Sequence, residues 1–397
     1  MWQLTNAVRF YPWGSRTVIP ELLGQASPAE RPHAELWLGA HPDEPSVLAD
    51  GRPLDKAIAA EPEALLGPAV VDHFGPRLPF LLKVLAADTP LSLQAHPTPE
   101  QAEAGFAAEE AAGVPRDDPT RTFKDPYHKP ELLVALTTFE ALCGFRPIEG
   151  SLHCLAKLEV PELKPTIAAL ARGGLRAVIP QLLALDGERR AELVSAVAES
   201  AARFVAAGDP EFINTYRWAA RLAETYPGDP GVVISLMCNH LKLAPGEGVY
   251  LPAGNLHAYL CGAGIELMAS SDNVLRGGLT GKHVDLAALI EVLDFTDGKV
   301  PVITPVLGPG GLRYDTPFEE FLLRRLDAGP ADGVVAVPEG GPRILLCTAG
   351  AARLRSGDQG LELRRGASAW LPVGDTDVTL TAAVDGTQLF LASDALG

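Results

Sequence analysis

Two kinds of hydrophobic pattern divide this 397-residue chain. Short alternating or continuous apolar runs, typical of β-strands, dominate residues 1–149 and return from residue 226 onward. Between them, residues 150–225 carry apolar side chains at helical spacing, for example at Leu193 and Val197. The pattern therefore predicts a mainly β protein with an inserted helical block.

Individual elements can be placed within this outline. The first part contains strands at 80–85 and 90–96 and only one helix. That helix begins with Thr98 as N-cap and Pro99 at the first helical position. Further elements are predicted as helical at 166–170, 182–185 and 217–223, and as extended at 360–364 and 377–381.

A Gly-x5-Pro-x-Gly pattern occurs twice, at residues 246–254 and again 120 residues later at 366–374. Such a pattern suits a strand, a tight turn and a return strand. It resembles the second sequence motif of cupins, which are antiparallel barrels of jelly-roll type. In cupins a metal-binding His stands three residues after the last Gly, where the first copy has His257 and the second has Asp377. A chance repeat in a chain rich in Gly and Pro is the alternative.

The chain is too long for one ordinary core, and three units are predicted. Residues 1–149 and 226–300 would form a metal-bearing cupin domain. Residues 150–225 would form an inserted helical domain, and residues 301–397 a cupin-like domain without metal. The predicted fold is thus two cupin-type jelly-roll barrels and a helical insertion.

Composition narrows the choice of partner. The formal charge of −17, without a basic stripe, argues against nucleic acid, although a few cations in one cleft could bind a small phosphate. No apolar run approaches a membrane span, and the first fifteen residues show no signal peptide. The five cysteines form no CxxC motif, which favours free thiols. We expect a cytoplasmic protein without nucleic-acid, membrane or obligate protein partners.

Three separate segments carry possible metal ligands. In the strand around residues 91–96, alternation puts Ser92, Gln94 and His96 on one face. Taken alone, this segment also suits a solvent-facing strand.

The second segment is Asp125–Glu131, where an extended chain puts Lys129 and Glu131 on one face and His128 on the other. Pro130 cannot donate to a sheet, so it marks an edge strand or the start of a strand. Alternation therefore nominates Glu131 as a ligand. On its own, this segment also suits a surface turn.

The third segment is the first Pro-x-Gly turn, which carries His257. Nitrogen and oxygen ligands suited to Zn²⁺ or a similar divalent ion would then come from four residues, namely Gln94, His96, Glu131 and His257. Only Glu131 is charged, so the centre would keep a net positive charge and suit catalysis. A polar, Gly-rich segment follows, with Glu266, Asp272, Arg276 and Lys282. Alone, that segment would suit a hairpin with exposed salt bridges.

Taken together, seven segments resemble the type I mannose-6-phosphate isomerase (phosphomannose isomerase) family of the cupin superfamily. They lie in the family order at residues 11–15, 34–42, 83–85, 91–97, 125–131, 252–257 and 265–282. The resemblance implies a zinc-dependent isomerase that interconverts mannose 6-phosphate and fructose 6-phosphate through a cis-enediol. It implies one Zn²⁺ per chain, held by Gln94, His96, Glu131 and His257.

The resemblance also assigns pocket residues, namely Lys83, Ser92, Lys129, Glu266, Asp272, Arg276 and Lys282. Arg276 is expected to stabilise developing negative charge because its guanidinium stays protonated. Glu266 is the preferred base, with Lys129 and Asp272 as alternatives. His128 or Lys129 could open the sugar ring, and Ser92 and Lys282, with Lys83, could hold the phosphate.

Two other functions fit a cupin. An iron oxygenase would need open positions for O₂ and a richer His set, and a non-catalytic sugar binder would not require Glu266, Arg276 and Lys282 together. The sequence does not decide the base, the direction of flux, the tolerance for other sugar phosphates or the oligomeric state. The effect of Tyr127, which stands where the family has Asn, is also left open.

Overall fold

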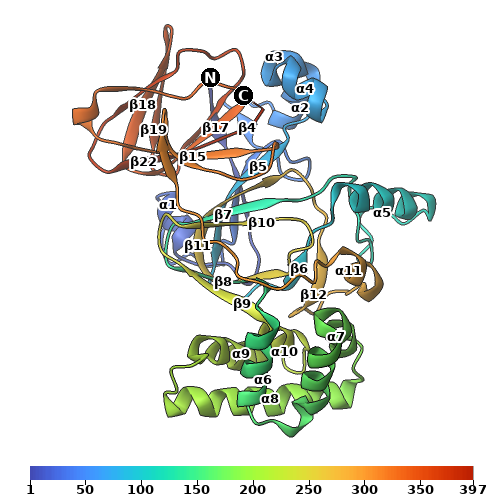
Figure 1. The fold of residues 1–397 in the computed structure, drawn as a ribbon. Helices are drawn as coiled ribbons and strands as arrows, with labels where there is room; N and C mark the ends of the chain where they lie inside the picture. The colour runs from blue at the N-terminus through green and yellow to red at the C-terminus, as the bar shows by residue number, and fades with distance from the viewer. Residues whose placement is uncertain (397) are drawn as a thin grey trace.

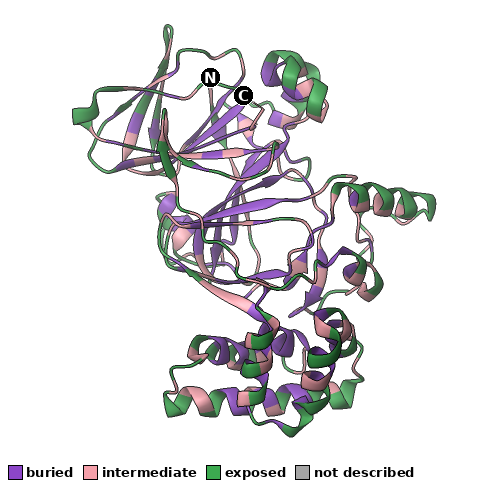
Figure 2. Ribbon diagram, in the orientation of Figure 1, coloured by how far each residue is buried: buried purple, intermediate pink, exposed green. Residues whose placement is uncertain are grey.

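The computed structural model describes residues 1–396. Figure 1 shows three parts in a row: a C-terminal β unit, a central β unit and a block of helices at the far end. Both chain termini lie at the C-terminal β unit. Buried residues run through the sheets of both β units and the inner faces of the helices (Figure 2).

Strand β11 (His257–Ala269) organises the central unit, because it belongs to two sheets. Its first residues pair with β6 (Leu93–Ala95) and β8 (Phe139–Phe145). Its later residues pair with β5 (Phe80–Ala87) and β7 (Glu131–Ala135). All four pairings are antiparallel. The unit is completed by β2 (Ala7–Arg9), β3 (Glu35–Gly39), β9 (Cys238–Leu243), β10 (Gly248–Leu251) and β12 (Leu275–Gly278).

The helical block packs against the end of the central unit. Leu155 and Val197 from the helices share one buried cluster with Leu256 and Ala258 of the central unit. The block consists of α6 (Ile148–Lys157), η1 (Pro161–Leu163), α7 (Lys164–Leu183), α8 (Gly187–Ala207), α9 (Ile213–Thr225) and α10 (Gly231–Ser235). Among the described residues, no single helix is both long and apolar enough to cross a membrane, although the bent pair 161–183 and 187–207 passes that test by length and composition.

The C-terminal unit stacks two sheets around a buried apolar cluster that includes Leu345, Leu354 and Leu380. The larger sheet contains β13 (Val306–Gly308), β14 (Gly311–Tyr314), β15 (Leu322–Ala328), β22 (Thr387–Ser393), β17 (Arg343–Ala349), β20 (Ser368–Leu371), β1 (Trp2–Thr5) and β4 (Val47–Leu48). The smaller contains β16 (Val334–Ala336), β21 (Thr379–Ala382), β18 (Ala351–Ser356) and β19 (Gln359–Arg364). Two N-terminal strands thus belong to the C-terminal sheet. The domain boundaries stay a prediction.

The predicted fold class is confirmed: the protein is mainly β with a helical insertion, and its sheets are antiparallel and not closed into barrels. The repeated motif has the same local form twice, since β10 and β20 each end directly before a Pro-x-Gly turn. Asp377, at the position equivalent to His257, is exposed. The N-cap at Thr98 is confirmed, because its side chain accepts the Gln101 N–H in a capping box at the start of α5 (Pro99–Ala111).

The prediction of a single helix in the first part was wrong. Four more helices lie there, namely α1 (Val18–Leu22), α2 (Leu54–Ala60), α3 (Pro62–Leu66) and α4 (Pro68–Phe74), and a later helix, α11 (Leu286–Val292), interrupts the second β segment. Each has five to seven residues. Such helices are too short to show a helical period, and packing rather than local pattern decides them.

We predict that Leu155→Ala lowers the free energy of unfolding by about 2–5 kcal/mol, because Leu155 is fully buried in the cluster shared by the helices and the central unit. Denaturant unfolding followed by circular dichroism would measure it. Leu307→Ala is the matched control, since Leu307 is 78% exposed and should change stability by less than about 0.5 kcal/mol. A comparable loss in both variants would contradict a shared core.

Candidate metal centre and substrate cavity

Three buried side chains from different segments converge on one point. His96 follows β6, Glu131 begins β7 and His257 begins β11. His96 Nε2 lies 3.2 Å from Glu131 Oε1, and His257 Nε2 lies 3.5 Å from Glu131 Oε2. Ligand atoms of all three residues lie within 4.8 Å of one another. This spacing suits one metal ion at their centre.

The tautomers of both imidazoles are determined by backbone carbonyls. His96 Nδ1–H donates to Asn273 O at 2.7 Å, and His257 Nδ1–H donates to Asn255 O at 3.0 Å. A carbonyl only accepts, so each Nε2 carries a lone pair. Both Nε2 atoms and Glu131 Oε2 are buried and have no hydrogen-bond partner among the described residues. A divalent cation would satisfy all three, so this donor set fits a metal.

The charge states agree with that use. Burial lowers the pKa of His96 to about 4, so its imidazole is neutral at physiological pH. Burial alone would raise the pKa of Glu131, but the nearby Lys129 and His96 hold it well below its usual value. Lys129 Nζ lies 3.1 Å from Glu131 Oε1. The centre therefore offers the neutral imidazole of His96 and the ionised carboxylate of Glu131 beside His257 Nε2.

Gln94 lies on the strand next to His257. It pairs in register with His257 on one side and with Arg276 on the other. Gln94 also lines a cavity of about 510 Å³. Paired residues on neighbouring strands share one face of the sheet, so Gln94 stays the predicted fourth ligand.

The cavity is more basic than the rest of the chain. Six basic and three acidic side chains line it, a balance of +3 in a chain of net charge −17. The basic residues are Arg9, Lys83, Lys124, Lys129, Arg276 and Lys282, and the acidic ones are Glu35, Asp43 and Asp272. Such a local balance can bind a small dianion against the overall charge.

One wall is formed by a buried ion cluster around Lys83. Its Nζ lies 3.2 Å from Glu266 Oε2 and 3.6 Å from Glu35 Oε1. Burial would lower the pKa of Lys83, but these carboxylates raise it, so Lys83 stays protonated. Burial raises the pKa of Glu266 against the opposing effect of Lys83. Trp37 Nε1–H donates to Glu35 Oε2 at 2.9 Å and anchors the cluster.

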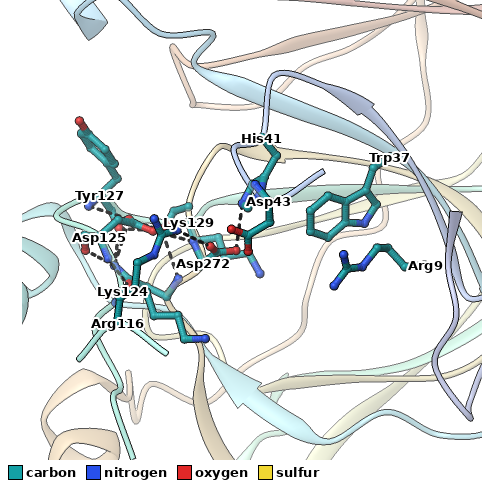
Figure 3. A network of polar contacts seen from close by, with 12 residues as sticks. Arg9, Trp37, His41, Asp43, Arg116, Lys124, Asp125, Tyr127, Lys129 and Asp272 are labelled. Atoms are coloured by element: carbon teal, nitrogen blue, oxygen red, sulfur yellow. Dashed lines mark hydrogen bonds and ion pairs between the residues drawn. The ribbon is translucent and has the colours of Figure 1, made fainter. Parts of the chain in front are cut away.

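Asp272 forms part of another wall, and Figure 3 shows it between His41 and Arg116. His41 Nδ1 accepts the Asp43 N–H, so its Nε2–H donates to Asp272 Oδ1 at 3.1 Å. Arg116 Nη2 donates to Asp272 Oδ2 at 3.1 Å. Burial would raise the pKa of Asp272, but His41 and Arg116 hold it below its usual value. Asp272 is therefore an ionised, oriented carboxylate.

Cations gather in a further part of the cavity. Arg276, Lys124 and Lys282 all line it. Burial, followed by repulsion from the like charges of Arg276 and Lys124, lowers the pKa of Lys282. A bound anion would relieve this repulsion.

Most residues predicted for the site meet here. Seven line the cavity, namely Lys83, Ser92, Gln94, Lys129, Asp272, Arg276 and Lys282. Glu266 lies behind Lys83 and is 3% exposed. His128 does not join them, because its ring turns away and hydrogen-bonds to Glu320 of the C-terminal unit. The ring of Tyr127 stacks on the guanidinium of Arg77, with 3.5 Å between Arg77 Cζ and the ring centroid. Tyr127 lines a neighbouring cavity instead.

Several cavity residues were not identified from the sequence. They are Arg9, Tyr11, Trp13, Glu35, Trp37, Asp43, Lys124 and Tyr226. Tyr11, Trp13, Glu35 and Trp37 lie in segments that carry the family resemblance, so that resemblance could have identified them as site residues. Tyr226 is different, because it reaches the cavity from the end of the helical block, where its hydroxyl donates to Pro90 O.

Residues 1–148 match the family model described as phosphomannose isomerase type I, catalytic domain. The chain is also 37% identical over 390 residues to a mannose-6-phosphate isomerase of Escherichia coli (strain K12), covering 96% of this chain and 97% of that protein. The chain belongs to the type I phosphomannose isomerase family.

Other members of the type I phosphomannose isomerase family agree over the same length. Mannose-6-phosphate isomerase 1 of Arabidopsis thaliana is 31% identical over 411 residues, covering 96% of this chain and 91% of that protein. A crystal structure of mannose 6-phosphate isomerase from Salmonella typhimurium, bound to its substrate and to zinc, has a TM-score of 0.89. That structure is 35% identical, and the match covers 100% of both chains. The family fold thus extends over the whole chain.

We predict that Glu131→Gln removes most bound zinc, because it neutralises the only charged side chain of the buried ligand set. Metal analysis after dialysis against a weak chelator would measure zinc per chain. Glu140→Gln is the matched control, since Glu140 is a part-buried carboxylate that pairs with His240. Full zinc retention by Glu131→Gln would exclude this site.

Proposed function

We propose that this chain is a zinc-dependent aldose–ketose isomerase that interconverts mannose 6-phosphate and fructose 6-phosphate. The observation that carries the proposal is the convergence of His96, Glu131 and His257, whose unpartnered atoms lie beside a basic cavity. Similarity over the full chain to proteins named mannose-6-phosphate isomerase supports it.

The reaction moves a proton between C1 and C2 of the open-chain sugar through a cis-enediol. When bound, zinc would supply positive charge that favours an oxyanion on the sugar. We propose that Gln94, His96, Glu131 and His257 hold that ion. Arg276, which pairs in register with Gln94, would stabilise the same developing charge with a permanently protonated guanidinium.

The phosphate needs a separate site away from the metal. We propose that Ser92 and Lys282 hold it, since both line the cavity and Lys282 lies where cations repel one another. Lys83 was expected to help, but it already neutralises Glu35 and Glu266 inside the wall. We therefore assign Lys83 to orienting Glu266.

For the base we propose Glu266, because burial moves its pKa upward, toward the range in which a carboxylate exchanges protons efficiently. It would take the proton from one sugar carbon and return it to the other. Lys129 and Asp272 are the alternatives, and both reach the cavity directly. Lys129 is also better placed than His128 to assist ring opening, since His128 faces Glu320.

The remaining expectations stay predictions. The five cysteines are free thiols, and four of them are buried, which suits a reducing compartment such as the cytoplasm. The net negative charge suits a protein without nucleic-acid partners. Absence of membrane and obligate protein partners stays a prediction as well.

The function is tested by following fructose 6-phosphate formation from mannose 6-phosphate, with glucose 6-phosphate as control substrate. We expect turnover of mannose 6-phosphate, loss of turnover after chelation and recovery on adding Zn²⁺. An oxygenase would instead consume O₂, and a non-catalytic binder would bind the sugar without product. Undiminished turnover by verified metal-free protein would end the zinc proposal.

We predict that Glu266→Gln lowers kcat by about 100-fold or more, as expected when a general base is lost. Steady-state kinetics would measure it. Glu35→Gln is the matched control, because it removes the other carboxylate beside Lys83. Equal losses in both would show that Glu266 only orients Lys83, and a loss confined to Lys129→Met would transfer the role to Lys129.

A further inference from the structure

Asn273 lies in the loop between β11 and β12 and is fully buried. Its Oδ1 accepts the backbone N–H groups of Lys124 at 2.7 Å and of Asp125 at 3.3 Å. Its Nδ2 donates to the carbonyls of Asp125 at 2.7 Å and Tyr127 at 2.8 Å. Residues 124–127 have no regular secondary structure, so their backbone groups lack the partners that a neighbouring strand would supply. The side-chain amide of Asn273 supplies those hydrogen bonds instead.

The backbone of the same residue contacts the metal centre. Asn273 O accepts the Nδ1–H of His96 at 2.7 Å, and this bond leaves the His96 Nε2 lone pair free. The segment that the amide holds leads within a few residues to Lys129 and Glu131. Asn273 therefore contacts the ligand His96 directly, and it also holds the segment that precedes the ligand Glu131.

The adjacent residues strengthen this connection. Asp272 N–H donates to Asp125 Oδ2 at 2.7 Å, and Ser271 Oγ–H donates to Asp125 Oδ1 at 2.8 Å. Figure 3 shows Asp125, Lys124 and Asp272 in one network. Lys124 and Asp272 both line the cavity, whereas Asn273 does not.

We propose that Asn273 is a positioning residue that couples the metal centre to the cavity wall formed by residues 124–127. It acts through His96 and through the 124–127 backbone, without touching the substrate. The proposal rests on the metal ligands of the proposed function. It also explains why an amide is required, since the side chain must accept from two N–H groups and donate to two carbonyls at once.

Asn273→Asp tests this requirement, because the variant keeps the shape and the acceptor but turns a carboxylate oxygen toward two carbonyls. Asn273→Ser is a second variant in case the aspartate does not fold. Thr387→Val is the matched control: Thr387 is also fully buried, and its hydroxyl bonds the backbone at Ala351 and Val384 in the C-terminal unit.

Three quantities are measured: the zinc dissociation constant by chelator competition, the rate of trypsin cleavage after Lys124 in metal-free protein, and thermal stability. Lys129 precedes Pro130, a bond that trypsin does not cut efficiently, so cleavage after Lys124 reports on the 124–127 segment. We expect Asn273→Asp to bind zinc about tenfold or more weakly and to be cleaved several-fold faster. Thr387→Val should lose thermal stability while keeping both other values.

Wild-type zinc affinity and wild-type trypsin resistance in the Asn273 variants would overturn the proposal. Equal changes in Thr387→Val would also overturn it, since they would reflect general loosening of the fold. Failure of the wild-type protein to bind zinc would count against the proposed function instead, because the trypsin measurement uses metal-free protein and tests the segment independently.

Discussion

The site is built around one energetically unfavourable feature. Three buried side-chain atoms that could bind a metal lack hydrogen-bond partners among the described residues. His96 Nε2, His257 Nε2 and Glu131 Oε2 face one another in a site that water barely reaches. Buried polar atoms without partners are costly, and a cation at their centre removes that cost. The carbonyls of Asn255 and Asn273 hold the rings so that both Nε2 atoms are available to such an ion.

Strand β11 brings the two halves of the site together because it changes sheets along its length. Its beginning places His257 beside Gln94, and its later part places Glu266 beside Lys83. One continuous strand therefore carries both His257 of the metal centre and Glu266, the proposed base. A shift in register by one residue would turn both sets of side chains to the opposite face.

The other two parts of the chain complete the cavity and its surroundings. Tyr226 approaches from the end of the helical block, and Glu320 of the C-terminal unit pairs with His128. Inside, carboxylates neutralise Lys83, while Lys282, Arg276 and Lys124 have no carboxylate partner among residues 1–396. This distribution allows a chain of charge −17 to offer a locally basic cavity.

The sequence by itself determined the features that depend on neighbouring residues. Strand alternation placed Gln94 with His96 and Lys129 with Glu131, and the repeated Pro-x-Gly motif indicated two related β units. Only the tertiary structure decided that His128 faces Glu320, that Glu266 lies behind Lys83 and that the first strand joins the last sheet. The short helices before residue 75 belong with these. The reason is physical: such contacts join residues far apart in the chain, and no local pattern of polar and apolar residues encodes them.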